Sequence, residues 1–198
     1  MTTARADRRR EEILESAARM FSEKGFHEAG IADIADDLKI GHGTVYRYFA
    51  SKSDLADRIQ ERIVELIVTA LVKEDPRSST TLGEYKAQVQ RIVLRLFELV
   101  STHPYLVRFF HRQAAVDLDR LAAAMDMFST YTEPFLVNGV ERGFLRADLD
   151  TELSAQILVG ALLDLLRRSA KTPPTAELQH RWLTSGVDLM FAGIAGSG

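Results

Sequence analysis

Apolar residues recur every three or four positions along this chain, over long stretches that only five prolines interrupt. Ile13, Ala17, Met20 and Phe21, for example, fall on one face of a helix. No alternating run bounded by turn residues indicates a β-strand. The pattern therefore predicts an all-α fold of about nine helices. We expect one helix ending near Lys24 and others over roughly 31–38, 44–49, 52–73, 81–102, from Pro104 onward, 117–142, 151–170 and 175–194.

Composition excludes several classes of protein and site. The 198 residues contain no cysteine, which excludes disulfides, iron–sulfur clusters, cysteine-ligated zinc and thiol catalysis. The longest apolar run, Ile157 to Leu163, falls far short of the ~20 residues of a membrane span. No apolar signal-peptide core follows Met1. We therefore expect a cytoplasmic protein with no membrane association.

The helical pattern of the first 60 residues predicts a helix-turn-helix. Three short helices are expected within about 45 residues, and Gly41 and Gly43 bracket the break between the second and third. In the third helix Ile40, Val45 and Phe49 can anchor the helix against the domain. The outward positions carry no acidic residue: His42, Thr44, Tyr46, Arg47 and Tyr48. A short helix with such a face can enter a DNA major groove, although the net charge of the whole chain is −3.

The run Gly43-Thr44-Val45-Tyr46-Arg47-Tyr48-Phe49-Ala50-Ser51-Lys52-Ser53-Asp54-Leu55 resembles the signature of the tetracycline-repressor (TetR) family of bacterial regulators. So do Ile13-Leu14 with Ala17, Phe21, Gly25-Phe26 and Asp33-Ile34-Ala35. The resemblance is close over residues 9–58 and extends beyond them only as a general layout. It implies a helix-turn-helix DNA-binding domain over residues 1–51, followed by a helical ligand-binding and dimerisation domain over residues 52–198.

The resemblance also implies which residues touch DNA. Thr44, Tyr46, Tyr48 and Lys52 would contact phosphates or sugars, and His42, Gly43 and Thr44 would lie nearest the base edges. Arg47 would reach either a base or a phosphate. Two alternatives stay open: Tyr46 and Tyr48 can belong to the core, and the arginines at 5, 8, 9 and 10 can either contact DNA or pair with nearby glutamates.

Two helix starts depart from the family pattern. The family usually has Ser or Thr before the second helix and often before the third, where this chain has Ala29-Gly30 and Gly41. Glycine is a tolerable N-cap, so the fold survives the change. The hydroxyl contacts to phosphate are lost. We therefore expect fewer phosphate contacts than in a typical member and a shallower dependence of DNA affinity on salt.

The middle helices carry the residues proposed to meet a small apolar or amphipathic effector. These candidates are Phe97, His103, Phe109, Phe110, His111, Met125, Phe128 and Tyr131. Bulky residues at helical spacing also make an ordinary core, and His103 and His111 can equally be surface or satisfied core groups. The pattern leaves room for an apolar cavity without requiring one.

The last two helices are predicted to form a dimer interface. Their stripes include Leu153, Ile157, Ala161, Leu165, Trp182, Leu183, Val187 and Met190. Two helices from each chain would make a four-helix bundle across a two-fold axis. The alternative is that these stripes cover the chain's own core. Asp164, inside the apolar run, can pair with Arg167, with Arg168 or with an arginine of the partner.

No motif in the sequence supports catalysis, a metal or a cofactor. Ile31 stands where a zinc-binding HExxH motif needs its second histidine, and Tyr46 replaces the third glycine of a dinucleotide fingerprint. The prediction is a homodimeric transcriptional repressor. It binds a palindromic operator in double-stranded DNA and is controlled by a small effector. The alternative is a ligand-independent DNA-binding protein of the same fold, acting in chromosome organisation or cell division.

Overall fold

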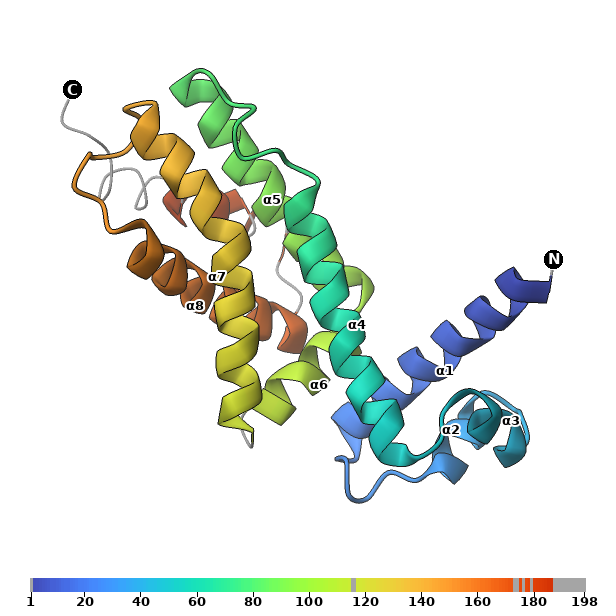
Figure 1. The fold of residues 1–198 in the computed structure, drawn as a ribbon. Coiled ribbons are helices and arrows are strands. Elements are labelled where there is room, and N and C mark those ends of the chain that lie inside the picture. Colours follow the sequence, from blue (N-terminus) through green and yellow to red (C-terminus); the bar gives the residue numbers. More distant parts are fainter. Residues whose placement is uncertain (1, 115–116, 173–174, 176, 179, 187–198) are drawn as a thin grey trace. The chain divides into compact units, whose positions relative to one another are not determined.

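The structure is a computed structural model that describes residues 2–114, 117–172, 175, 177–178 and 180–186. The described residues form helices joined by turns, without a strand, which confirms the predicted fold class (Figure 1). The helices with defined bounds are α1 (Thr2–Glu23), α2 (Ile31–Asp37), α3 (His42–Tyr48), α4 (Lys52–Val72), α5 (Leu82–Thr102), α6 (Pro104–Ala114), α7 (Leu118–Glu141) and α8 (Thr151–Lys171). The described residues of 177–186 are also helical, where the sequence predicts the ninth helix.

The helix ends follow from local chemistry. Gly25 and Gly143 adopt φ values of +96° and +72° just after α1 and α7, a left-handed conformation that glycine tolerates best. The Ser51 hydroxyl accepts from the backbone N–H of Asp54, and the Asp54 carboxylate accepts from that of Ala50. These two bonds cap the start of α4 in the manner of a capping box.

The turn before α3 differs from the prediction. Its left-handed residue is Lys39, with φ of 52°, whereas Gly41 is an extended N-cap with φ of −72°. Gly43 lies inside α3 and does not bracket the break. The turn therefore needs no glycine at 41 or 43 for its backbone conformation. The lysine is held there by the backbone bond from Ile40 N to Ala35 O, which closes the turn.

The chain divides into two compact units, and the boundary at residue 65 falls within α4. The first unit comprises residues 1–65 and 103–117, so α6 belongs with the first three helices. In this unit α6 packs against α1, and α2 packs against both α1 and α3. The Ser16 hydroxyl of α1 donates to Asp37 of α2 (2.6 Å) and, with Arg19, lowers the pKa of that carboxyl.

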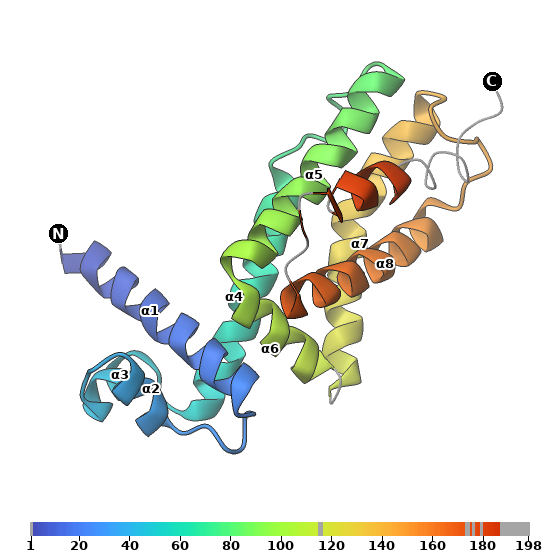
Figure 2. The same ribbon diagram turned by 180° about the vertical axis from the view of Figure 1, so that it is seen from behind.

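The second unit comprises residues 66–102 and 118–198, in which α8 packs against both α7 and α5 (Figure 2). Its core includes Tyr85, Leu136, Leu145 and Ala155. The Tyr85 hydroxyl donates to the carbonyl oxygen of Phe135 (2.9 Å), and burial raises the pKa of this phenol. Within the described part of the chain, no helix is both long enough and apolar enough to cross a membrane.

Candidate nucleic-acid interface

Helix α3 is held in the first unit by two fully buried side chains. Val45 and Phe49 are at most 1% exposed, in agreement with their predicted anchoring role. Ile40, the third predicted anchor, is only partly buried. The guanidinium of Arg10 in α1 lies 5.3 Å from the centre of the Phe49 ring. The apolar side of α3 is therefore fixed, and the opposite side faces outward.

The outward side carries the residues predicted to touch DNA. His42, Gly43, Tyr46 and Arg47 are exposed, whereas Thr44 and Tyr48 are partly buried. The Tyr46 side chain is 55% exposed, which excludes the alternative that it belongs to the core. No acidic residue lies in α3. Helix α3 therefore presents hydrogen-bonding side chains that phosphates and base edges can use, and it repels neither.

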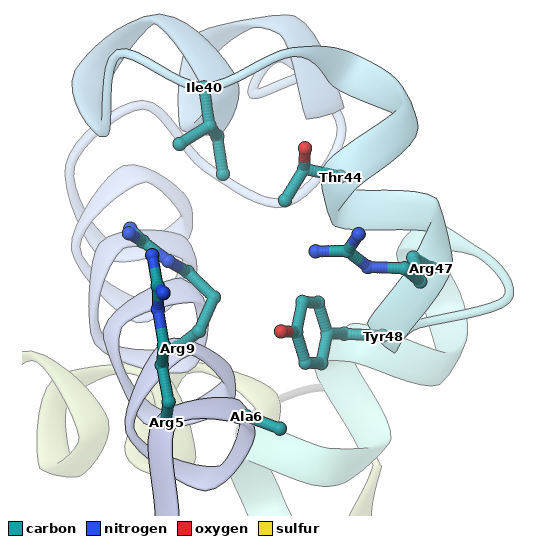
Figure 3. Close-up of a pocket in the computed structure, with 7 residues that line it drawn as sticks. All are labelled: Arg5, Ala6, Arg9, Ile40, Thr44, Arg47 and Tyr48. Carbon is teal, nitrogen blue, oxygen red and sulfur yellow. The ribbon is translucent and has the colours of Figure 1, made fainter. Parts of the chain in front are cut away.

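A pocket opens between the start of α1 and the exposed side of α3. We call it the arginine pocket; it is lined by Arg5, Ala6, Arg9, Ile40, Thr44, Arg47 and Tyr48 and encloses about 440 Å³. Figure 3 shows the guanidinium groups of Arg5 and Arg9 on one side and that of Arg47 on the other, pointing toward them. The Tyr48 hydroxyl points into the same space. Arg5 and Arg9 are four residues apart and therefore share one face of α1.

The four N-terminal arginines have different surroundings. Arg8 pairs with Glu12 (3.2 Å), and Arg10 lies over Phe49. Arg9 also reaches Glu12 (2.8 Å), although it lines the pocket. Pairing with a glutamate is therefore observed for Arg8 and Arg9. Contact with DNA stays a prediction for all four arginines.

Lys52 lies at the start of α4 and is partly buried. Its ammonium donates to the carbonyl oxygen of His27 (3.1 Å) and lies 4.7 Å from the centre of the Phe26 ring.

The helix start at α2 has no side-chain cap from Gly30, as the departure from the family pattern predicts. Instead the Asp33 carboxylate accepts from the Gly30 N–H (2.7 Å). The Lys24 ammonium and this N–H hold the pKa of Asp33 below its usual value.

The predicted effector residues do not fall in one unit. Phe97, Met125, Phe128 and Tyr131 lie in the second unit, whereas His103, Phe109, Phe110 and His111 lie on or beside α6 in the first. In the first unit His103 pairs with Glu15 of α1, and Phe109 packs against Phe21. In the second unit Phe97 stacks on Trp182, with ring centres 5.5 Å apart, and Tyr131 is 38% exposed. Effector contact stays a prediction for all eight.

Helix α8 presents two apolar faces. Ala155, Val159, Leu163 and Leu166 are buried in the unit's own core. On another face Leu153 and Ile157 are 52% and 62% exposed and continue to the exposed Ala161 and the partly buried Leu165. Asp164 pairs with both Arg167 and Arg168 of its own helix. Trp182 and Leu183 are partly buried, and Val187 and Met190 lie outside the described residues.

Comparison with known proteins adds three findings. Residues 13–59 match the family described as bacterial regulatory proteins of the tetR family. The transcriptional repressor KstR2 of Mycobacterium tuberculosis is 31% identical over 156 residues, covering 73% of each chain. Its structure, described as that of a ketosteroid transcriptional regulator, matches with a TM-score of 0.65 over 96% of both chains, at 24% identity.

Two further proteins are similar along most of their length. The nucleoid occlusion factor SlmA of Escherichia coli is 29% identical over 88% of this chain and 91% of its own. The structure of the fatty acid degradation regulator FadR from Bacillus halodurans matches with a TM-score of 0.73 at 19% identity. It covers 92% of this chain and 94% of its own. The helix-turn-helix and the larger helical unit are therefore both shared with known regulators.

Proposed function

This chain belongs to the TetR family of bacterial regulatory proteins and is a DNA-binding transcriptional regulator, and from that premise we propose how it works. It acts as a homodimeric repressor that binds a palindromic operator through α3. A small apolar or amphipathic effector in the helical domain controls its release. His42, Gly43 and Thr44 lie nearest the base edges, whereas Tyr46, Tyr48 and Lys52 hold the phosphate backbone.

The exposed side of α3 is the observation that carries this proposal. A seven-residue helix anchored by Val45 and Phe49 leaves its other side open, with hydrogen-bonding side chains and without a carboxylate. Gly43 is exposed, and among the described residues no atom from outside its own stretch of α3 lies within 4 Å of the place where a Cβ would be. The backbone of α3 can therefore approach a base pair closely. These features suit the major groove, whose base edges present donors and acceptors in a distinct pattern for each base pair.

The exposed apolar stripe of α8 supports dimerisation. Leu153, Ile157 and Ala161 recur every four residues and leave the buried face of the same helix intact. Burying such a stripe against its copy gives an isologous interface about a two-fold axis. A two-fold dimer presents two α3 helices and therefore matches an operator with two inverted half-sites.

An apolar effector is supported by the relatives. KstR2 is described as a ketosteroid regulator and the B. halodurans protein as a fatty acid degradation regulator, and both names point to largely apolar molecules. In the second unit Ser129 and Asn138 of α7 have buried polar atoms that find no hydrogen-bond partner among the described residues. A buried polar group without a partner destabilises the fold, so these atoms are suited to form hydrogen bonds with a polar end of an effector.

Selection of tight-binding duplexes from a random DNA pool tests the proposal. Enrichment of a two-fold symmetric site is the expected result. Steroid and fatty-acyl compounds are then screened for those that lower affinity for the enriched site. Failure to enrich any site would contradict sequence-specific DNA binding. An enriched site without inverted symmetry would contradict the proposed two-fold dimer.

A second candidate function is a role in chromosome organisation without an effector. It is favoured by the likeness to SlmA, which covers 88% of this chain. In this case the same symmetric site would be enriched, but no apolar compound would change the affinity. The effector screen therefore distinguishes the two functions.

A further inference from the structure

We propose that the arginine pocket is a phosphate-binding site that clamps one phosphate of the operator backbone between α1 and α3. This assignment rests on the proposed function, because it places the pocket at the DNA surface. It gives Arg5 and Arg9 a specific role and makes Arg47 a phosphate-binding residue. The bases are left to the first residues of α3.

The composition of the pocket matches a phosphate group. Three of its seven lining residues are arginines, two carry hydroxyls, and none is acidic. Guanidinium groups stay charged at any physiological pH and bind phosphate oxygens with two parallel N–H bonds. The Thr44 and Tyr48 hydroxyls supply neutral donors of the kind that also bind phosphate. A volume of about 440 Å³ is enough for a phosphodiester and part of its sugar.

The charges in the pocket are incompletely balanced within the chain. Among the described residues, neither Arg5 nor Arg47 forms an ion pair with an acidic group; Arg47 instead lies over the Tyr48 ring, 5.3 Å from its centre. Arg9 is the exception, since it also reaches Glu12. Three guanidinium groups around one space repel one another unless an anion lies between them. The pocket thus has a positive potential that an anion would neutralise.

The position of the pocket identifies the DNA backbone as the source of the phosphate. Thr44, Arg47 and Tyr48 line it and also belong to α3, whose Tyr46 side chain is exposed on the same short helix. A duplex that meets α3 therefore lies within reach of the pocket. The two other N-terminal arginines are engaged elsewhere, Arg8 with Glu12 and Arg10 with Phe49, which provides a matched control.

The test compares Arg5→Ala with Arg8→Ala in the full chain. Each variant loses one positive charge from an exposed position near the start of helix α1, but of the two residues only Arg5 lines the pocket. Affinity is measured against salt concentration for the selected operator and for a scrambled duplex of equal length. Arg5→Ala is expected to weaken both complexes by a similar factor, roughly tenfold, and to reduce the salt slope by about 1 for each protomer bound. Arg8→Ala should leave the slope near that of the unchanged protein.

A charge-preserving variant separates phosphate binding from folding. Arg5→Lys should keep the salt slope while losing part of the affinity, because an ammonium keeps the charge but not the two-bond geometry. Equal effects of Arg5→Ala and Arg8→Ala would overturn the proposal in favour of a general charge effect. A loss confined to the operator would overturn it in favour of a base contact. If the unchanged protein selects no operator but the slope difference remains, the proposed function fails and the phosphate site stands.

The source of the phosphate is tested on the side chains themselves. NMR signals of the arginine Nε–H groups are followed as inorganic phosphate or duplex DNA is added. Duplex is expected to shift the signals of Arg5, Arg9 and Arg47 and to leave that of Arg8 unchanged, with no saturable shift from inorganic phosphate. Saturation by inorganic phosphate alone would overturn the DNA assignment and make this a site for a free phosphate ligand.

Discussion

The ammonium group of Lys52 makes contacts within the protein itself. It donates to the His27 carbonyl and lies against the Phe26 ring. An ammonium has three donors, so donors remain for a phosphate. Replacing Lys52 therefore removes an internal contact as well as a charge, whereas the hydroxyl of the exposed Tyr46 has no such internal role in the described structure. Tyr46 is the cleaner probe of backbone contact.

Tyr46→Phe should weaken binding to every duplex by a similar factor. The loss of one hydrogen bond to a charged oxygen costs about 1–2 kcal/mol, roughly tenfold in affinity. Fluorescence anisotropy with the operator and with a scrambled duplex measures the effect, and thermal unfolding should be unchanged. Lys52→Ala, in comparison, should lower both the affinity and the unfolding temperature. An unchanged affinity of the Tyr46→Phe variant would contradict the proposal that Tyr46 contacts the DNA phosphate backbone.

Glu74 gives the second unit a pH-dependent stability. This residue is 8% exposed and accepts hydrogen bonds from Arg91 (2.7 and 2.9 Å) and Arg95 (2.6 Å). The bonds from Arg91 and then Arg95 lower the pKa of Glu74 from 4.5 to about 2. Because the folded pKa is the lower one, the stabilisation is complete above pH 4.5 and disappears as the pH falls toward 2.

Glu74→Gln should cost about 2 kcal/mol of unfolding free energy at neutral pH. Urea unfolding at several pH values measures the difference between the variant and the unchanged protein. The difference should shrink as the pH falls from 4.5 toward 2, since protonation removes the same charge. A difference that is constant over this range would show that the charge of Glu74 contributes nothing.

Within α7, one glycine is required by packing and not by backbone conformation. A Cβ at Gly139 would lie 2.6 Å from Leu145 Cδ1 and 2.9 Å from the Tyr85 hydroxyl oxygen. Tyr85 cannot yield easily, because its hydroxyl donates to the Phe135 carbonyl. Gly139→Ala should therefore destabilise the protein by about 1–3 kcal/mol, although alanine is the better helix former.

Gly83→Ala is the matched control for Gly139→Ala. Gly83 lies in the first turn of α5, and a Cβ added there would meet no atom of the described residues within 4 Å outside its own stretch of helix. Alanine at this position should therefore be neutral or stabilising by about 0.5 kcal/mol. Thermal or urea unfolding of both variants measures the contrast. Equal effects at the two positions would contradict the close packing of α7 against Tyr85 and Leu145.

The exposed stripe of α8 predicts a separation of dimerisation from folding. Ile157→Glu places a charge on a side chain that is 62% exposed in the protomer, so each protomer should stay folded. Burying this charge at an interface is costly, and the dimer should dissociate. Sedimentation velocity measures the change. Leu94→Glu, a similar change at an exposed position of α5, should leave the dimer intact. An intact Ile157→Glu dimer would place the interface elsewhere.

The sequence predicted the described helices well, because each carries its own periodicity and end signals. The bounds of α2, α5 and α8, for example, lie within a residue of those expected. The backbone of the turn before α3 was not predictable in the same way. A glycine-rich stretch indicates a break, but the left-handed residue is Lys39, whose conformation depends on how α2 and α3 pack.

The candidate site was predictable only in part. The exposed side of α3 follows from which residues of a short helix must be buried. The arginine pocket does not, because it depends on Arg5 and Arg9 of α1 meeting α3; the four-residue spacing of these arginines was the only signal. The grouping of α6 with α1 is likewise a tertiary result. For this reason the predicted effector residues divide between two units.

At the level of the whole molecule, the proposed repressor is a dimer with two copies of α3 related by a two-fold axis. Each base contact must then occur twice, once in each half of the operator. A substitution at the start of α3 should change the preferred base at two symmetric positions and leave the half-site spacing unchanged. His42 is the best position for this test, because it is exposed at the first turn of α3 and distant in role from the anchors Val45 and Phe49.

The most direct measurement is selection from random DNA with the unchanged protein and with His42→Ala, side by side. The unchanged protein should enrich a two-fold symmetric site. The variant should lose its preference at one base pair of each half-site and keep the rest of the site and its spacing. The same site enriched with the same preferences by both proteins would contradict base reading by the start of α3.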